Sequence, residues 1–255
     1  MQRVNQFLYL FTKRIFDILL SVFGLLLASP ALLPIMFIVW LQDRNSPFYV
    51  ANRVGKNFEI FKMVKLRSMV ANADKTGVDS TSNTDLRITT IGKIIRRYKL
   101  DEITQLWNVL KGEMSLVGPR PNVSRETDLY SSEEKKLLSM KPGITDFASI
   151  VFSDEGEILE GKSDPDLAYN QLIRPGKSKF GLYYIENRNS LTDFVLIFLT
   201  LVTIVSRHRA LKLISMYLTF CKAPEDLILL ALRTTPLVPS PPPGMLDIVK
   251  ERGAH

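Results

Sequence analysis

The chain is poor in the residues that build disulfides and metal centres. It has one cysteine, Cys221, and two histidines among 255 residues. A single cysteine excludes an internal disulfide and suits a reducing compartment, and we expect Cys221 to serve as buried packing. His208 has no partner at the spacing of a metal site. Internal repeats are also absent, and no small-residue cleavage site follows the apolar N-terminal stretch, which argues against a cleaved signal peptide.

Acidic residues are scarce in two segments of the first half of the chain. Between residues 44 and 73, Glu59 is the only acid against six cations, and residues 87–99 hold five cations and no acid. The net charge of +7 implies an anionic partner, such as lipid head groups, nucleic acid or a phosphorylated substrate. One run of cations is most often a solvated surface. Two runs near an apolar segment should at least bind anionic lipid.

One apolar run of 27 residues, 15–41, contains Asp17 as its only charge. The run is long enough to cross a bilayer, which needs about 20 apolar residues. Ser29-Pro30 interrupts it, because proline supplies no N–H and disfavours helical dihedrals in the residue before it. Cations lie on both sides, without the asymmetry that a spanning helix shows. Two interpretations stay open: one span with a proline kink, or a re-entrant helix that returns to the same side.

Later segments give coarser signals. Aromatic and β-branched residues after the Gly55 turn predict a strand or hairpin. The apolar helix predicted from Asp193 to about Val205 is short of a span, so we expect it in the interface or in a core. The tail after about residue 235 contains five prolines, which exclude a regular helix or a central strand and favour an extended or disordered chain.

The segment 101–112, DEITQLWNVLKG, has apolar residues at helical spacing and predicts one amphipathic helix that ends at Gly112. Asp101 and Glu102 lie in its first turn, where acids stabilise any helix N-terminus. A functional interpretation stands beside that structural one. A carboxylate next to a bound phosphate can attack phosphorus, and its neighbour can ligate Mg²⁺. Downstream, Pro119 and Pro121 flank Arg120, whose guanidinium would be preorganised for bidentate phosphate contact.

Together these pieces resemble the bacterial sugar transferases of the monotopic phosphoglycosyl transferase superfamily. The matching segments are KRIFDILLS (13–21), Ser29-Pro30, ANRVGK (51–56), FKMVKLRSM (61–69), RITTIGKIIRRYKLDEITQLWNVLKGEMSLVGPRP (87–121) and KPGIT (141–145). The continuous match over residues 100–121 is the most specific part of the resemblance.

The resemblance implies an α+β fold that is predominantly helical. It predicts a re-entrant helix-break-helix over residues 1–42, with the break at Ser29-Pro30. A compact cytosolic catalytic domain with a small β-hairpin and interfacial amphipathic helices would follow over 43–205, and a C-terminal extension with a proline-rich tail over 206–255. The protein would be monotopic, on the cytoplasmic face of the bacterial inner membrane, which favours the re-entrant interpretation.

Such enzymes transfer a sugar 1-phosphate from a UDP-sugar to undecaprenyl phosphate and so begin glycan assembly. By resemblance, Asp101 would attack the sugar-bound phosphate, release UMP and hold a covalent phosphosugar that the lipid phosphate then attacks. Glu102 would ligate Mg²⁺, the implied cofactor. The implied partners are the UDP-sugar, undecaprenyl phosphate and membrane lipids, without nucleic acid, and a homodimer stays open.

The resemblance also places several cations. Lys65 and Arg96 would steady the acids and phosphates, and the Pro119-Arg120-Pro121 turn would face the nucleotide. Arg53 and Arg67 match motif positions, but the resemblance leaves their individual duties open.

The chain departs from the family pattern after KPGIT, where many relatives carry an aromatic residue and later an Asn-Gly-Arg turn. Here residues 154–166 contain six acids against Lys162, which favours a solvated loop over a second metal site. Arg174 or Arg188 would be the substitutes for the missing phosphate contact. Two rival functions remain: a non-catalytic, membrane-attached basic adaptor that binds anionic lipid, and a catalytically inactive relative with a regulatory role.

Overall fold

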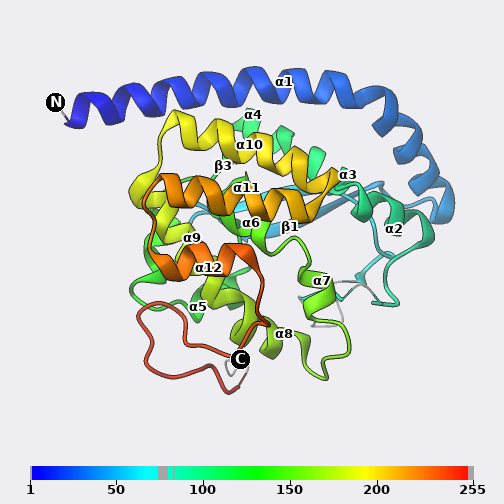
Figure 1. Ribbon diagram of the computed structural model, residues 1–255. Coiled ribbons are helices and arrows are strands. Elements are labelled where there is room, and N and C mark those ends of the chain that lie inside the picture. Colours follow the sequence, from blue (N-terminus) through cyan, green and yellow to red (C-terminus); the bar gives the residue numbers. More distant parts are fainter. Residues whose placement is uncertain (1, 74–79, 83, 252–255) are drawn as a thin grey trace.

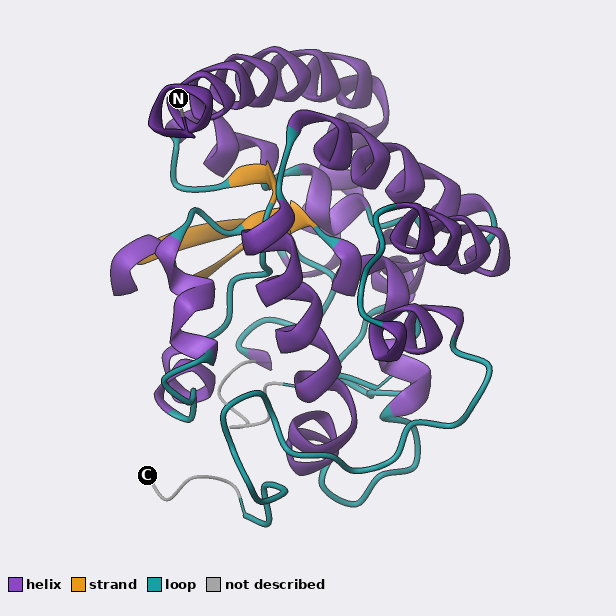
Figure 2. Cartoon of the chain, turned by 60° about the vertical axis from the view of Figure 1, so that its left-hand side comes forward, coloured by secondary structure: helices purple, strands orange, loops and turns teal. Residues whose placement is uncertain are grey.

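A computed structural model describes residues 2–73, 80–82 and 84–251, with side chains from Gln6 onward. The fold is mostly helical, with one long apolar helix, α1 (Gln2–Asp43), lying along one side of a body of shorter elements (Figure 1). Figure 2 shows the strands beneath α1, with further helices beyond them. The predicted combination of predominant helix, small sheets and a long N-terminal apolar helix is therefore confirmed.

The other elements follow in chain order. The first half of the body contains β1 (Phe48–Val54), η1 (Lys56–Phe58), β2 (Ile60–Leu66), α2 (Thr90–Arg97), α3 (Leu100–Ile103), α4 (Leu106–Lys111), β3 (Ser115–Val117), α5 (Ser124–Asp128), η3 (Glu134–Ser139) and β4 (Gly143–Thr145). The second half contains α6 (Phe147–Val151), α7 (Glu155–Ile158), α8 (Pro165–Ala168), η4 (Tyr169–Ile173), α9 (Arg174–Asn187), α10 (Ser190–Val205), α11 (Arg207–Phe220) and α12 (Glu225–Leu232).

Strands β1 and β2 form the hairpin that the Gly55 turn predicts. They pair antiparallel, with Tyr49 opposite Lys65, and the Gly55 N–H donates to the Glu59 carbonyl at 2.7 Å to close the turn. Side chains alternate between the two faces of a strand. On β2, Phe61 and Met63 therefore face the same buried cluster, and Lys65 lies on that same face of the strand.

Strands β3 and β4 pair in parallel and bring two glycines into backbone contact. A Cβ on Gly118 would lie 2.7 Å from the Lys141 carbonyl oxygen, and a Cβ on Gly143 would lie 2.1 Å from the Gly118 nitrogen. Only glycine fits such a close approach of two backbones. The contact fixes the segment that begins at Gly118, and so fixes where the following Arg120 can lie.

Helix α1 has two limbs, one before and one after Ser29-Pro30. Polar side chains hold the first limb against the body. Lys13 pairs with Asp193 of α10 at 2.8 Å, and Asp17 accepts a hydrogen bond from the Leu116 N–H at 3.0 Å. Arg14 donates to two carbonyls at the end of α4, at 2.6 and 2.8 Å. These bonds satisfy charged groups that would otherwise be costly to bury. The first limb of α1 therefore rests on the body.

The second limb of α1 returns to the same body. Leu32 and Val39 are buried in one apolar cluster with Leu66 of β2 and Ile95 of α2. Arg67, directly after β2, holds the end of this limb through two bonds to Asp43, at 2.5 and 2.7 Å. Figure 1 shows α1 turning sharply toward α2. Both ends of the long helix are thus bound to one globular unit.

Ser29-Pro30 lies between these limbs, and the helix continues through it. The pyrrolidine ring of Pro30 leaves the Leu26 carbonyl without its usual intrahelical donor. The Ser29 hydroxyl donates to that carbonyl at 2.8 Å. The helix therefore bends at this pair without ending, and Pro34 lies inside the same helix.

The main core gathers around α6, α9, α10 and α11 and includes Phe147, Phe180, Leu196 and Ile214, each at most 1% exposed. Helices α11 and α12 contribute to this core, so the C-terminal extension packs into the same body. Cys221 follows α11 and is exposed. The prediction that it is buried was wrong, because Cys221 lies in the turn that joins α11 to α12.

The described part of the proline-rich tail is not helical. It lies against the loop at Ser131 and against η4. Ser131 donates to the Pro243 carbonyl at 2.6 Å, and the Gln171 side chain donates to the Val249 carbonyl at 2.8 Å. The Ser240 N–H donates to the Gln171 carbonyl at 3.1 Å. Of the two predicted states, extended or disordered, the described part of the tail takes the extended one, because it finds hydrogen-bond partners at Ser131 and at Gln171 of η4.

Arg174, a predicted substitute for the missing phosphate contact, is committed to a buried ion pair. Its guanidinium donates to both carboxylate oxygens of Glu134, at 2.9 and 2.6 Å, and the two side chains are 2% and 0% exposed. Ser178 adds a bond to Glu134 at 2.7 Å. A bidentate pair at this depth holds η3 against α9.

We expect Arg174→Met to destabilise the protein by about 3–5 kcal/mol, because it leaves the Glu134 carboxylate buried without its partner. Thermal unfolding in detergent micelles measures the loss. Lys179→Met is the matched control, since Lys179 lies on the same helix in an exposed pair with Asp226, and such pairs contribute little. Equal shifts in the two variants would contradict a structural role for the buried pair.

Candidate active site

The predicted acid pair lies on α3, a helix of a single turn with two different sides. Leu100 and Ile103 pack against the apolar cluster formed by the second limb of α1, β2 and α2. Asp101 and Glu102 occupy the first turn, as predicted, and are half-buried. Lys99 precedes them in a left-handed conformation, with φ of 54°, so the chain turns sharply into the helix. Packing against α1, β2 and α2 therefore orients the carboxylates.

The single helix predicted over 101–112 is two helices, α3 and α4, with Thr104 and Gln105 between them. Asn108, on α4, connects this segment to the neighbouring strand β2. It accepts from the Val64 N–H at 2.9 Å and donates to the Lys62 carbonyl at 2.7 Å, so it completes the open edge of β2. Thr104 donates to the Val64 carbonyl at 3.2 Å. Two polar side chains therefore dock the acid-bearing segment beside Lys65.

Sequence reasoning missed Asn108, although a signal for it was present. Thr104 and Asn108 are four residues apart and share one face of a helix, and both are buried. The apolar residues at helical spacing, which predicted an amphipathic helix, face a different direction. Leu106 contacts Gly24 of α1, and Trp107 is 54% exposed. The polar stripe faces the protein, and the apolar stripe faces the long helix and the surroundings.

Glu102 is held as a carboxylate. Arg120 donates to its Oε1 at 2.6 Å. Burial alone would raise the pKa of Glu102, but Arg120, Lys99 and Lys65 outweigh it and lower that pKa to about 2. Glu102 is therefore negatively charged at neutral pH and oriented by a fixed guanidinium.

Asp101 behaves differently from its neighbour. Burial raises its pKa above the ordinary value, and the charge of Glu102 adds to that rise, while Lys65 and Arg96 oppose it. Lys65 shows the complementary effect: burial lowers its pKa to about 8, with a further contribution from Arg120. Two adjacent carboxylates with pKa values pushed in opposite directions are typical of catalytic sites.

The structure brings most of the predicted site residues together. Lys65, Arg96 and Arg120 all interact electrostatically with Asp101, and Arg53 of β1 interacts with Lys65. Pro119 and Pro121 are buried on either side of Arg120. Two predicted positions lie elsewhere: Arg67 pairs with Asp43 at the end of α1, and Ser29-Pro30 lies within α1. What these residues do in function remains a prediction.

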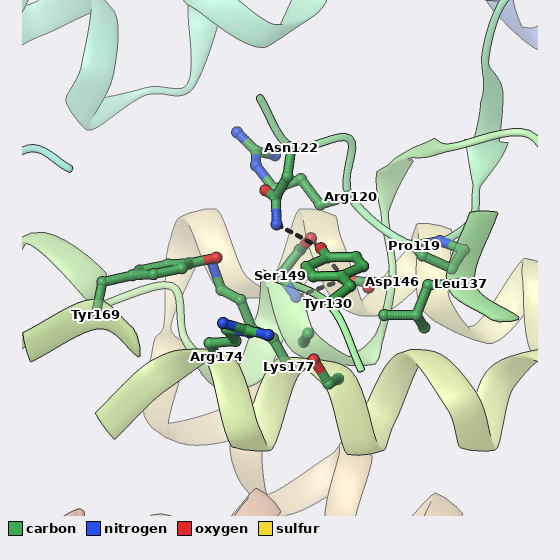
Figure 3. A pocket seen from close by; sticks show the side chains of 12 residues that line it. Pro119, Arg120, Asn122, Tyr130, Leu137, Asp146, Ser149, Tyr169, Arg174 and Lys177 are labelled. Atoms are coloured by element: carbon green, nitrogen blue, oxygen red, sulfur yellow. Dashed lines mark hydrogen bonds between the residues drawn. The ribbon is translucent and has the colours of Figure 1, made fainter. Parts of the chain in front are cut away.

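A hollow of about 30 Å³, enough for a water-sized molecule, adjoins Arg120 (Figure 3). Asn122, Tyr169 and Lys177 are among the residues that line it. Lys177 forms an ion pair with Glu155. Sequence reasoning read the acid-rich stretch containing Glu155 as a solvated loop, but the structure folds its start and end into α7 and α8. No cluster of three metal-ligating side chains occurs within residues 6–73, 80–82 and 84–251.

The donor set fits a magnesium ion that binds together with a phosphorylated ligand. Mg²⁺ takes oxygen ligands, keeps several waters and is often held by one or two carboxylates plus substrate phosphates. Glu102, ionised and fixed by Arg120, is the carboxylate suited to that role. The cations around it provide the positive surroundings that phosphate oxygens need.

The chain is similar to several known proteins. A family model described as "Bacterial sugar transferase" matches residues 8–207. The chain is 32% identical over 205 residues to the exopolysaccharide production protein ExoY of Sinorhizobium fredii, covering 74% of this chain and 84% of that protein. It is 33% identical over 215 residues to the undecaprenyl-phosphate galactose phosphotransferase of Salmonella typhimurium, covering 78% and 42%.

A third relative carries a different sugar in its name. It is the UDP-N-acetylgalactosamine-undecaprenyl-phosphate N-acetylgalactosaminephosphotransferase of Aeromonas hydrophila, 32% identical over 202 residues, with 78% of this chain and 45% of that protein covered. The chain thus spans most of ExoY but less than half of the other two relatives. The matched segment ends at residue 207, so α11, α12 and the tail follow it.

We expect the amine of Lys65 to titrate near pH 8, and Arg120→Met to raise that pKa by removing a neighbouring positive charge. The measurement is the pH dependence of trace acylation at Lys65, read by mass spectrometry of its peptide. Asp226→Asn, which alters only an exposed pair on α12, should leave the midpoint unchanged. A midpoint near the ordinary lysine value in the unmodified protein would contradict the site electrostatics described above.

Proposed function

The chain belongs to the bacterial sugar transferase family, and we propose that it transfers a sugar 1-phosphate from a UDP-sugar to undecaprenyl phosphate. The observation that carries the proposal is the acid pair on α3, where Asp101 and Glu102 lie among Lys65, Arg96 and Arg120. A lipid-binding adaptor would need surface cations, but it would have no use for two half-buried carboxylates beside them. Its relatives with undecaprenyl phosphate in their names support the same substrate class.

Asp101 is the proposed nucleophile. Its carboxylate oxygen attacks the phosphorus that bears the sugar, the bond from that phosphorus to the bridging oxygen breaks, and UMP leaves with the electron pair. An acyl phosphate joins Asp101 to the sugar. A phosphate oxygen of the lipid then attacks the same phosphorus, and the Asp101 carboxylate is released. Its raised pKa makes Asp101 the more basic of the two acids, and basicity favours nucleophilic attack.

The cations bind and orient the phosphates. Arg120 and Lys65 can contact the donor diphosphate while they hold the carboxylates in place, and phosphoryl transfer depends mainly on such positioning and charge neutralisation. When bound, Mg²⁺ would be held by Glu102 and would neutralise charge on the phosphates. Two successive displacements avoid the need to hold both anionic substrates at once.

We also propose that α1 is re-entrant and that the catalytic body lies on the cytoplasmic face. By length and composition, Gln6–Asp43 could cross a membrane, and only 11% of its most apolar window is buried in the protein. Yet Lys13 on the first limb and Asp43 at the end of the second contact the same body. A straight span would carry one end to the opposite side of the bilayer, away from these partners.

Asp101→Asn should leave membrane attachment intact and reduce UMP release from a UDP-sugar by more than about 10³-fold, because the amide cannot act as the nucleophile. Intact-protein mass spectrometry after incubation with donor alone should show a phosphosugar adduct on the wild type and none on the variant. Asp226→Asn, an exposed acid on α12, is the matched control and should keep both signals. Wild-type turnover in Asp101→Asn would refute the nucleophile assignment.

Topology can be tested with single cysteines in a Cys221→Ser background, which is needed because Cys221 is exposed. Gln6→Cys and Asn45→Cys place thiols at exposed positions near the two ends of α1. We expect a membrane-impermeant thiol reagent added outside intact cells to label neither, and to label both after the membrane is permeabilised. Labelling of one alone in intact cells would establish a spanning helix.

A further inference from the structure

Two arginines of the C-terminal helices converge on one carboxylate of the body. Arg207 begins α11, where the family match ends, and Arg233 follows α12, beyond that match. Both guanidinium groups pair with the same oxygen of Asp154, Oδ2, at 2.8 and 3.1 Å. Asp154 is the first residue of the acid-rich segment 154–166, where the sequence departs from the family pattern. The C-terminal extension therefore contacts the segment in which this chain differs from that pattern.

The contact is largely withdrawn from solvent. The side chains of Asp154 and Arg233 are 11% and 10% exposed, whereas that of Arg207 is 34% exposed. Arg233 also lies over the ring of Phe152, 5.3 Å from its centroid, and Arg207 donates to the Val151 carbonyl at 3.3 Å. Ion pairs that are partly buried are screened much less than exposed ones. The two arginines therefore hold the turn between α6 and α7 in place.

Holding Asp154 also places Glu155, the next residue. Glu155 begins α7, and Asp154 occupies the capping position before it. A helix of one turn has almost no stability of its own, so its position depends on such contacts. Glu155 pairs with Lys177 of α9. Lys177 and Arg120 line the same hollow (Figure 3), and Glu155 interacts electrostatically with both cations.

The charge of Glu155 bears on the acid pair through Arg120. Arg120 and Lys177 carry the same charge, and without a carboxylate near both they would repel each other across the hollow. Arg120 also donates to Glu102 at 2.6 Å. A displaced Glu155 would leave the repulsion uncompensated and shift the guanidinium that orients Glu102. Misplacement by about 1 Å can cost on the order of 10²-fold in rate.

We propose that Arg207 and Arg233 are positioning residues for the transfer reaction. They hold Asp154, which places Glu155, and Glu155 keeps Arg120 in position beside the acid pair. The inference rests on the proposed function. It gives the C-terminal extension a part in the reaction as well as in stability. Neither arginine touches the substrate, because both act through the start of the segment 154–166.

The first measurement reads the position of Glu155 without catalysis. Trace acylation of the full-length protein in detergent micelles, followed by mass spectrometry, reports how firmly the ion pair holds the amine of Lys177. We expect Arg233→Met to raise the acylation rate at Lys177 by about 5-fold, the upper range for a pair that is partly exposed. Arg233→Lys keeps a charge near Asp154 and should restore part of the protection.

Kinetics test whether this displacement matters for the reaction. With the UDP-sugar that the wild type uses fastest in a panel, Arg233→Met should lower kcat/KM for UMP release by about 10- to 100-fold. Arg207→Met should have a smaller effect, because Arg207 is more exposed. In a Glu155→Gln background the rate should already be low, and Arg233→Met should reduce it little further, because residues that act as a unit are not additive.

Lys222→Met is the matched control, because Lys222 is an exposed cation of the same extension, in the turn between α11 and α12. It should leave the acylation rate and kcat/KM unchanged. Thermal unfolding of each variant separates loss of stability from loss of position. If Arg233→Met does not fold, the milder Arg207→Met takes its place in the same cycle with Glu155→Gln.

Two results would overturn the proposal. One is a lowered melting temperature in Arg233→Met with wild-type kcat/KM, which would leave the arginine a purely structural role. The other is a fully additive loss in the double variant with Glu155→Gln, because Arg233 would then act by another route. Absence of UMP release by the wild type with every UDP-sugar tested would refute the proposed function instead. The acylation rates at Lys177 do not depend on turnover, so the two failures are distinguishable.

Discussion

The acid pair, Asp101 and Glu102, depends on a single turn of helix that is held from two sides. Leu100 and Ile103 anchor α3 in the apolar cluster under the second limb of α1, and Asp101 and Glu102 face the cations on the other side. A four-residue helix has almost no stability of its own. Its orientation therefore comes from α1, α2 and β2, and the placement of α1 on the body sets the placement of the carboxylates.

The electrostatics follow from that placement. Half-buried acids next to half-buried cations respond to each other strongly, because the low-dielectric surroundings screen them poorly. Glu102, in direct contact with Arg120, stays ionised, while burial dominates at Asp101 and makes it more basic. The same surroundings thus raise the pKa of one carboxylate and lower the pKa of its neighbour. Such a difference suits the separate roles proposed for the two acids.

The sequence predicted the local features well and the long-range ones poorly. The hairpin, the acid pair in a first helical turn and the long apolar helix follow from turn residues, capping and hydropathy, which act over a few residues. Asn108 completes a strand edge more than forty positions earlier, and Glu155 finds Lys177 on a different helix. Such partnerships depend on tertiary packing, so a pattern in the sequence could show a buried polar stripe but not its partner.

The fastening of the tail has a consequence for biogenesis. Ser131 and Gln171 flank the segments that supply Tyr130 and Tyr169 to the hollow, and their partners, Pro243 and Val249, are synthesised long after them. Helix α1 is synthesised before these residues, and Pro243 and Val249 come near the end of the described chain. The walls around Tyr130 and Tyr169 can therefore be clamped only after nearly all of the described chain has been made, so this fastening is one of the last steps of folding.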